Sequence, residues 1–75
     1  MHLRPAELES VASALNTTDP LTLVEALRRL PVNDRAPTWE LAVRHLGRHK
    51  PLAQAAGEIG MDLVHARDLV VAFTL

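Results

Sequence analysis

Apolar residues recur at helical spacing along the whole chain, and prolines and glycines divide them into short stretches. Repeats at intervals of three and four residues place apolar side chains on one face of an α-helix. Signals for strands are missing, because β-branched residues are scattered, only two aromatic residues are present, and no Asn-Gly or Asp-Gly turn occurs. The sequence therefore predicts an all-α fold.

We expect a compact bundle of about five short helices that forms one domain over residues 1–75. Proline suits the first position of a helix, Asp or Asn often caps its N-terminus, and glycine commonly follows its last residue. Pro31 is expected to end the second helix, and a loop over residues 32–36 is expected to lead to Pro37. These signals place the helices near residues 5–15, 20–30, 37–47, 51–59 and 62–74.

The single tryptophan has two interpretations. Trp39 shares helical spacing with Ala42, Val43 and Leu46, which indicates that it is the largest side chain of the core. The alternative is that its ring is exposed and stacks on nucleic-acid bases. We favour the core position.

Composition excludes several classes of function. A chain without cysteine has no disulfide bond, thiolate zinc site or thiol catalysis, and a cytoplasmic location is expected. No apolar run approaches the length of about eighteen residues that a membrane span needs, and no secretory leader is expected. Neither a glycine-rich phosphate loop nor a paired nucleophile and base occurs. We therefore expect no enzyme, no cofactor and no membrane partner.

Two histidines have the spacing of a metal site. His45 and His49 are four positions apart, so on a helix their imidazoles lie close enough to share an ion. Gly47 weakens the helix between them, and no neighbouring carboxylate or cysteine completes a ligand set. We therefore expect no metal, and we interpret both histidines as exposed members of a basic patch.

Positive charge is concentrated in residues 35–50, which we call the basic segment. It carries a net charge of +3, whereas the parts before and after it each carry −2, giving −1 for the chain. Its charged residues are Arg35, Arg44, Arg48 and Lys50 against Glu40. Any contact with a polyanion is expected to begin at this segment, since the overall charge argues against indiscriminate binding.

The most specific pattern lies in Leu52–Val71, which reads LAQAAGEIGMDLVHARDLVV. Ala56 leaves room for two helices to cross closely, and Gly60 provides the positive φ that a short turn needs. Ala55 occupies a further apolar position, and the residues expected to fill the wedge between the helices are Ile59, Met61, Ala66 and Leu69. The segment resembles the helix-turn-helix of bacterial regulators, and the residues leading into it resemble Fis-like DNA-binding domains.

That resemblance implies binding of double-stranded DNA in transcription regulation. The helix from Asp62 onward would enter the major groove, where His65 and Arg67 would contact bases. The implied phosphate contacts are Arg44, Arg48, His49 and Lys50. The segment departs from the family in two respects, because Asp62 and Asp68 would repel phosphates and few side chains on this helix bond to bases.

The last helix carries more apolar residues than one core-facing side needs. The side formed by Ala66, Leu69, Val70 and Phe73 is expected to pack into the core. Leu63, Val64, Val71 and Leu75 fall largely outside that side. We expect Val64, Val71 and Leu75 to form the interface of a homodimer, although the surplus would also be explained if it completed a small core.

Two functions therefore follow from the sequence. The first is a small dimeric DNA-binding protein that uses the basic segment for phosphates and the last helix for bases. The second is a helical protein–protein interaction or assembly module that keeps the helix-turn-helix shape without binding DNA. The apolar last helix favours the second, but the basic segment lies beside the motif, where phosphate contacts belong, so we favour DNA binding and keep the interaction module as the alternative.

Overall fold

The computed structural model describes residues 3–75 and contains only helices and their connections in that range. The elements are α1 (Pro5–Ala14), α2 (Leu21–Arg28), α3 (Val32–Ala42), η1 (Val43–Gly47), α4 (Leu52–Glu58) and α5 (Leu63–Thr74). The predicted all-α fold is confirmed. Within the described residues no helix has the length and apolar character to cross a membrane.

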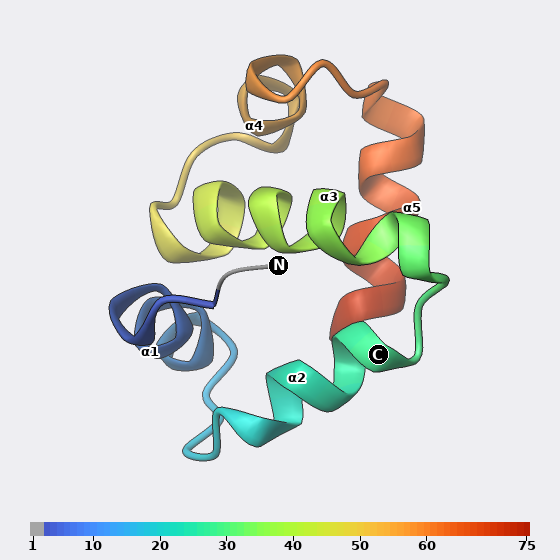
Figure 1. Cartoon of the computed structure of the whole chain (residues 1–75). Helices are drawn as coiled ribbons and strands as arrows, with labels where there is room; N and C mark the ends of the chain where they lie inside the picture. Colours follow the sequence, from blue (N-terminus) through green and yellow to red (C-terminus); the bar gives the residue numbers. More distant parts are fainter. Residues whose placement is uncertain (1–2) are drawn as a thin grey trace.

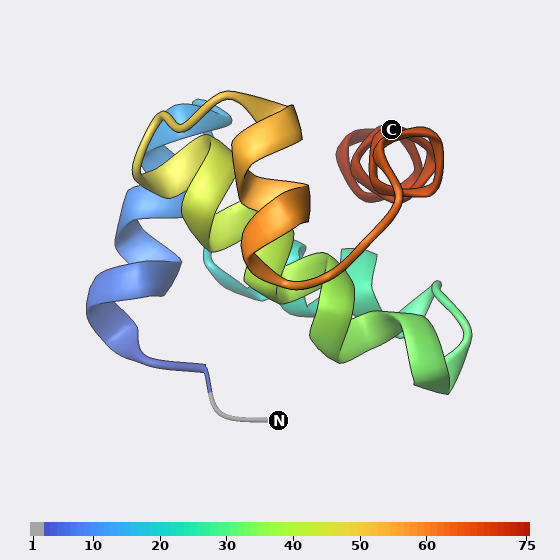
Figure 2. The same ribbon diagram turned by 90° about the horizontal axis from the view of Figure 1, so that it is seen from above.

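Helix α3 crosses the middle of the molecule, and the other helices are arranged around it (Figure 1). It packs against α2, α4 and α5, while α1 packs against η1. Viewed from above, α5 runs nearly end-on at one edge of the molecule, beside α4 (Figure 2). Among the described residues, none covers the side of α5 that faces away from α3 and α4.

Two clusters of buried side chains lie on either side of α3. The first contains Trp39, which is 2% exposed and meets Phe73 edge to face with ring centroids 6.4 Å apart. The other buried members of this cluster are Val11, Ala12, Leu23, Ala26, Leu27, Leu30, Ala42 and Val43. The predicted core position of Trp39 is confirmed.

The second cluster joins α3 to α4 and α5. Its buried members are Leu41, Ala55, Ala56, Ala66 and Leu69, with Leu52, Ile59, Met61 and Val70 packed against them. The small side chains of α4 and α5 let these helices approach each other closely. Because α5 contributes Phe73 to the first cluster and Leu69 to the second, both clusters fix its position.

The third helix begins five residues earlier than its sequence predicts. The expected loop over residues 32–36 is wrong, because these residues form the first turns of α3 and Pro37 lies inside the helix. A proline removes one hydrogen bond and crowds the carbonyl four residues back, which normally ends a helix. Here Arg35 holds the early turns in place, since Nε donates to the carbonyl oxygen of Leu30 and Nη2 to that of Arg28, each at 3.1 Å.

The other predicted helices agree with the structure to within two residues at each end. The third ends at Gly47 as expected, but its last turn is a π-helix. In this turn the backbone N–H of Arg48 donates to the carbonyl oxygen of Val43, five residues back, at 3.0 Å. Turns of this kind in α-helices frequently occur at functional sites.

Candidate functional site

The connection between α4 and α5 is a tight turn. Gly60 has a φ of +69°, a left-handed conformation that glycine adopts without steric cost. The N–H of Met61 donates to the carbonyl oxygen of Ala56 at 2.9 Å, which satisfies an acceptor at the end of α4. The turn therefore forms where the sequence places it, with glycine at the position that requires positive φ.

Asp62 caps the N-terminus of α5. Its carboxylate Oδ2 accepts hydrogen bonds from the backbone N–H groups of Val64 and His65, at 3.1 and 3.3 Å. A side-chain acceptor at this position satisfies helix donors that have no partner inside the helix. Asp62 thus fixes where α5 starts, and the predicted cap is confirmed.

A narrow line of apolar residues runs along the outward face of α5. Ala66, Leu69 and Phe73 are buried on the inward face. On the opposite side Val64, Val71 and Leu75 are 58%, 49% and 86% exposed, and we call these three residues the α5 stripe. Within the described chain six large hydrophobic residues are exposed, and four of them lie on α5 or directly after it: Leu63, Val64, Val71 and Leu75. The surplus apolar surface expected from the sequence is therefore present.

Two of the four predicted phosphate contacts are engaged with a glutamate. Arg44 Nε lies 3.1 Å from Glu58 Oε1, and Lys50 Nζ lies 2.9 Å from Glu58 Oε2. Arg44 also forms an ion pair with Glu40. The hydrogen bond from Lys50 holds the pKa of Glu58 below its ordinary value, with Gln54 and Arg44 adding to the effect against a smaller desolvation that raises it.

No sequence signal indicates this pairing, because Glu58 lies outside the basic segment. It reaches Arg44 from 14 positions along the chain, when α4 packs beside η1. Any phosphate at Arg44 or Lys50 would have to compete with the carboxylate of Glu58. The tertiary fold thus partly neutralises a segment that carries a net charge of +3.

Arg48 and His49 are exposed where η1 ends. Within residues 3–75 neither side chain forms an ion pair or hydrogen bond. His49 has a φ of +58°, so the chain turns sharply there. His45 instead donates from Nδ1 to the carbonyl oxygen of Lys50 at 2.7 Å. We call Arg48 and His49 the basic corner, since they are the predicted phosphate contacts that remain accessible.

The two predicted base contacts, His65 and Arg67, are both exposed on α5. At about 100° per residue, side chains two positions apart on an α-helix point about 160° away from each other. His65 and Arg67 therefore lie on different flanks of α5, with Val64 of the stripe between them. The helix geometry does not bring them to one surface.

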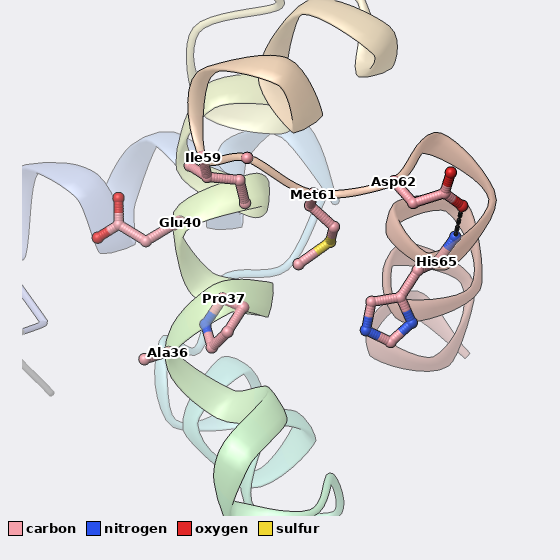
Figure 3. A pocket seen from close by; sticks show the side chains of 8 residues that line it. Ala36, Pro37, Glu40, Ile59, Met61, Asp62 and His65 are labelled. Carbon is pink, nitrogen blue, oxygen red and sulfur yellow. Dashed lines mark hydrogen bonds between the residues drawn. The ribbon is translucent and has the colours of Figure 1, made fainter.

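A shallow hollow of about 550 Å³ lies between α3 and the α4–α5 turn. Ala36 and Pro37 form one wall, and Ile59 and Met61 reach toward them from the turn (Figure 3). Glu40 and His65 border the hollow at its two sides. No spacing in the sequence indicates it, because its walls come from separate elements.

No protein-family model, curated protein or solved structure matches the chain. The candidate functional surfaces therefore rest on the residues of this chain and not on a related protein. They are the α5 stripe, which is apolar and faces away from the core, and the basic corner, which is positively charged and lies at the end of η1.

Proposed function

We propose that the protein is a helical protein–protein interaction module that binds through the α5 stripe. The observation that carries this proposal is the exposure of Val64, Val71 and Leu75 directly opposite the buried face of the same helix. Full burial of one valine or leucine side chain contributes about 1.5–3 kcal/mol relative to exposure. A partner that covers the stripe would recover this free energy, and the proposed activity is binding rather than catalysis.

The α5 stripe also argues against the recognition of DNA bases by this helix. Bases are recognised mainly by hydrogen-bonding side chains, and an apolar side chain finds only the methyl group of thymine in the major groove. The outward face of α5 presents the stripe where such donors would be needed. A protein partner therefore suits this face better than a base-pair edge does.

DNA binding remains a second proposal because of the basic corner. Arg48 is exposed and unpaired within the described residues, beside the two-helix unit that resembles a bacterial helix-turn-helix. In this proposal phosphates bind at Arg48 and His49, and at Lys50 and Arg44 when Glu58 is displaced. A cytoplasmic bacterial regulator is the setting that the sequence resemblance implies.

Selection of peptides tests the first proposal. A displayed library of amphipathic helical peptides is screened against the wild-type protein, and the binders are then titrated against Val71→Asp. We expect peptides that bind the wild type and lose at least tenfold in affinity to the variant. His65→Asp is the matched control, because it places the same charge on α5 outside the stripe and should retain binding. If selected peptides bind Val71→Asp as well as the wild type, the stripe is not the binding surface.

A salt titration tests the second proposal. Affinity for duplex DNA is measured at several salt concentrations for the wild type, Arg48→Ala and Lys50→Ala. Each phosphate contact contributes about −0.9 to the log–log slope. We expect Arg48→Ala to flatten the slope by about this amount and Lys50→Ala to change it less, because Lys50 is paired with Glu58. Absence of DNA binding by the wild type at low salt would exclude this proposal.

A further inference from the structure

We infer that the partner of the α5 stripe is a second copy of this chain, with the two α5 helices packed parallel and in register. This inference rests on the proposed interaction function and specifies its partner. It follows from two charged residues, Arg67 and Asp68, which border the stripe and are both exposed. Neither forms an ion pair within residues 3–75.

The two charges lie on opposite flanks of the stripe at almost the same height. Taking about 100° per residue from Val64, Arg67 lies about 60° to one side and Asp68 about 40° to the other. Val71 and Leu75 stay within about 20° of Val64, so they form the line between the flanks. Adjacent residues on a helix do not face each other, so Arg67 and Asp68 do not neutralise one another within one chain.

The symmetry of a dimer decides which charges meet. When two copies of a helix pack parallel about a twofold axis, each flank faces the opposite flank of the partner. Arg67 then meets Asp68 of the second copy, and the reciprocal pair forms on the other side. In an antiparallel pair centred at the height of these two residues, each flank faces its own copy, so arginine would meet arginine and aspartate would meet aspartate. The self-complementary arrangement is therefore the parallel one.

The parallel arrangement also stacks the apolar residues on themselves. Val64, Val71 and Leu75 each meet their own copy along the twofold axis. The two ion pairs between Arg67 and Asp68 lie on either side of this axis, at a height between Val64 and Val71. The uncovered side of α5 at the edge of the molecule leaves space for this approach (Figure 2). A contact between two single helices of twelve residues is smaller than the roughly 1,200–2,000 Å² of a stable interface. The dimer is therefore weak and forms at high micromolar concentration.

Exchanging the charges at Arg67 and Asp68 tests the register and the relative direction of the two α5 helices. Sedimentation equilibrium gives the dissociation constant of the wild type, Arg67→Glu, Asp68→Arg and the double variant carrying both changes. Each single change places like charges together twice per dimer, so we expect it to weaken the dimer about five- to tenfold. The double variant restores opposite charges and should return to within about twofold of the wild type. Equal dissociation constants for all four proteins would overturn the parallel arrangement.

Cysteine cross-linking provides an independent readout, because the chain contains no cysteine. Leu75→Cys and Val64→Cys should each form disulfide-linked dimers under mild oxidation, since each residue meets its own copy. In an antiparallel pair Val64 would instead lie near Val71 of the other copy. Cross-linking found only in a mixture of Val64→Cys and Val71→Cys would therefore overturn the inference. Circular dichroism establishes that each variant is folded.

The outcomes separate this inference from the function on which it rests. A wild type that stays monomeric at millimolar concentration overturns the dimer. If that monomer still binds selected helical peptides and Val71→Asp does not, the interaction function stands. If the wild type dimerises and Val71→Asp dimerises equally well, the stripe is not the dimer surface and the inference is overturned.

Discussion

Among single residues, Gly60 is the one whose backbone conformation most restricts what can replace it. Its φ of +69° is unfavourable for a β-branched side chain, although within residues 3–75 no heavy atom beyond its two chain neighbours lies within 4 Å of the position that a Cβ would occupy. The cost of Gly60→Val therefore comes from backbone strain rather than a steric clash with neighbours. We expect a loss of about 1–3 kcal/mol in the free energy of unfolding, measured by urea denaturation.

Gly57 provides the matched control for this prediction. It also has open space around its Cβ position, but it lies inside α4 in a helical conformation. Gly57→Ala should stabilise the protein by up to about 1 kcal/mol, because alanine favours a helix over glycine. If Gly60→Val were as stable as the wild type, the left-handed turn between α4 and α5 would not be required.

Asp62 combines a structural role with a charge that DNA would disfavour. Asp62→Ala removes the cap of α5 and is expected to cost about 0.5–2 kcal/mol in unfolding free energy. Asp62→Asn keeps a good capping acceptor while removing the negative charge, so its stability should stay close to that of the wild type. If duplex DNA is bound through α5, the asparagine variant should bind it more tightly than the wild type. Equal affinity would place the phosphates away from this end of α5.

At the scale of elements, Glu58 joins the end of α4 to the basic segment. Its carboxylate accepts from Lys50 and Arg44, and this pairing lowers its pKa in the folded protein. A lowered pKa means that the folded state favours the charged carboxylate. The stabilisation is present in full above the ordinary glutamate pKa of about 4.3, and it is lost as pH falls through the lower pKa of the folded state.

We therefore expect Glu58→Gln to flatten the dependence of stability on pH below about pH 5. Urea denaturation of the wild type and variant across this range measures the effect, which should shrink at high salt because the pair is near the surface. Glu9→Gln is the control, since Glu9 is exposed on α1 and forms no ion pair within residues 3–75. Parallel pH curves for wild type and Glu58→Gln would contradict this assignment.

The sequence predicts the local features of this fold, whereas the pairing of Glu58 is a long-range contact that it does not predict. Local signals suffice for the helical periodicity, for Gly60 in the turn and for Asp62 as a cap, because each acts within a few residues. Summing charge by segment misses Glu58, which meets Arg44 only after α4 has packed beside η1. The proline rule likewise fails at Pro37, where burial of α3 residues and the hydrogen bonds of Arg35 outweigh one lost helical bond.

For the whole molecule, α5 ties the binding surface to the core. Its inward side chains enter both buried clusters, with Phe73 in the first and Ala66 and Leu69 in the second. The α5 stripe on its outward side therefore keeps its position only while both clusters are packed. A ligand that binds the folded stripe should raise the melting temperature of the whole chain by mass action.

Helices α3 and α5 contribute residues to both buried clusters, so we expect the two clusters to unfold together. Leu41 is completely buried in the second cluster, whereas the only tryptophan, Trp39, reports on the first. Leu41→Ala should cost about 2–5 kcal/mol, and the milder Ile59→Val about 0.5–1.5 kcal/mol. In both variants we expect Trp39 fluorescence and far-ultraviolet circular dichroism to give the same melting temperature, lower than that of the wild type. A fluorescence transition that stays at the wild-type temperature while the helical signal melts earlier would show that the first cluster is stable without the second. The α5 stripe would then lose its fixed position before the rest of the molecule unfolds.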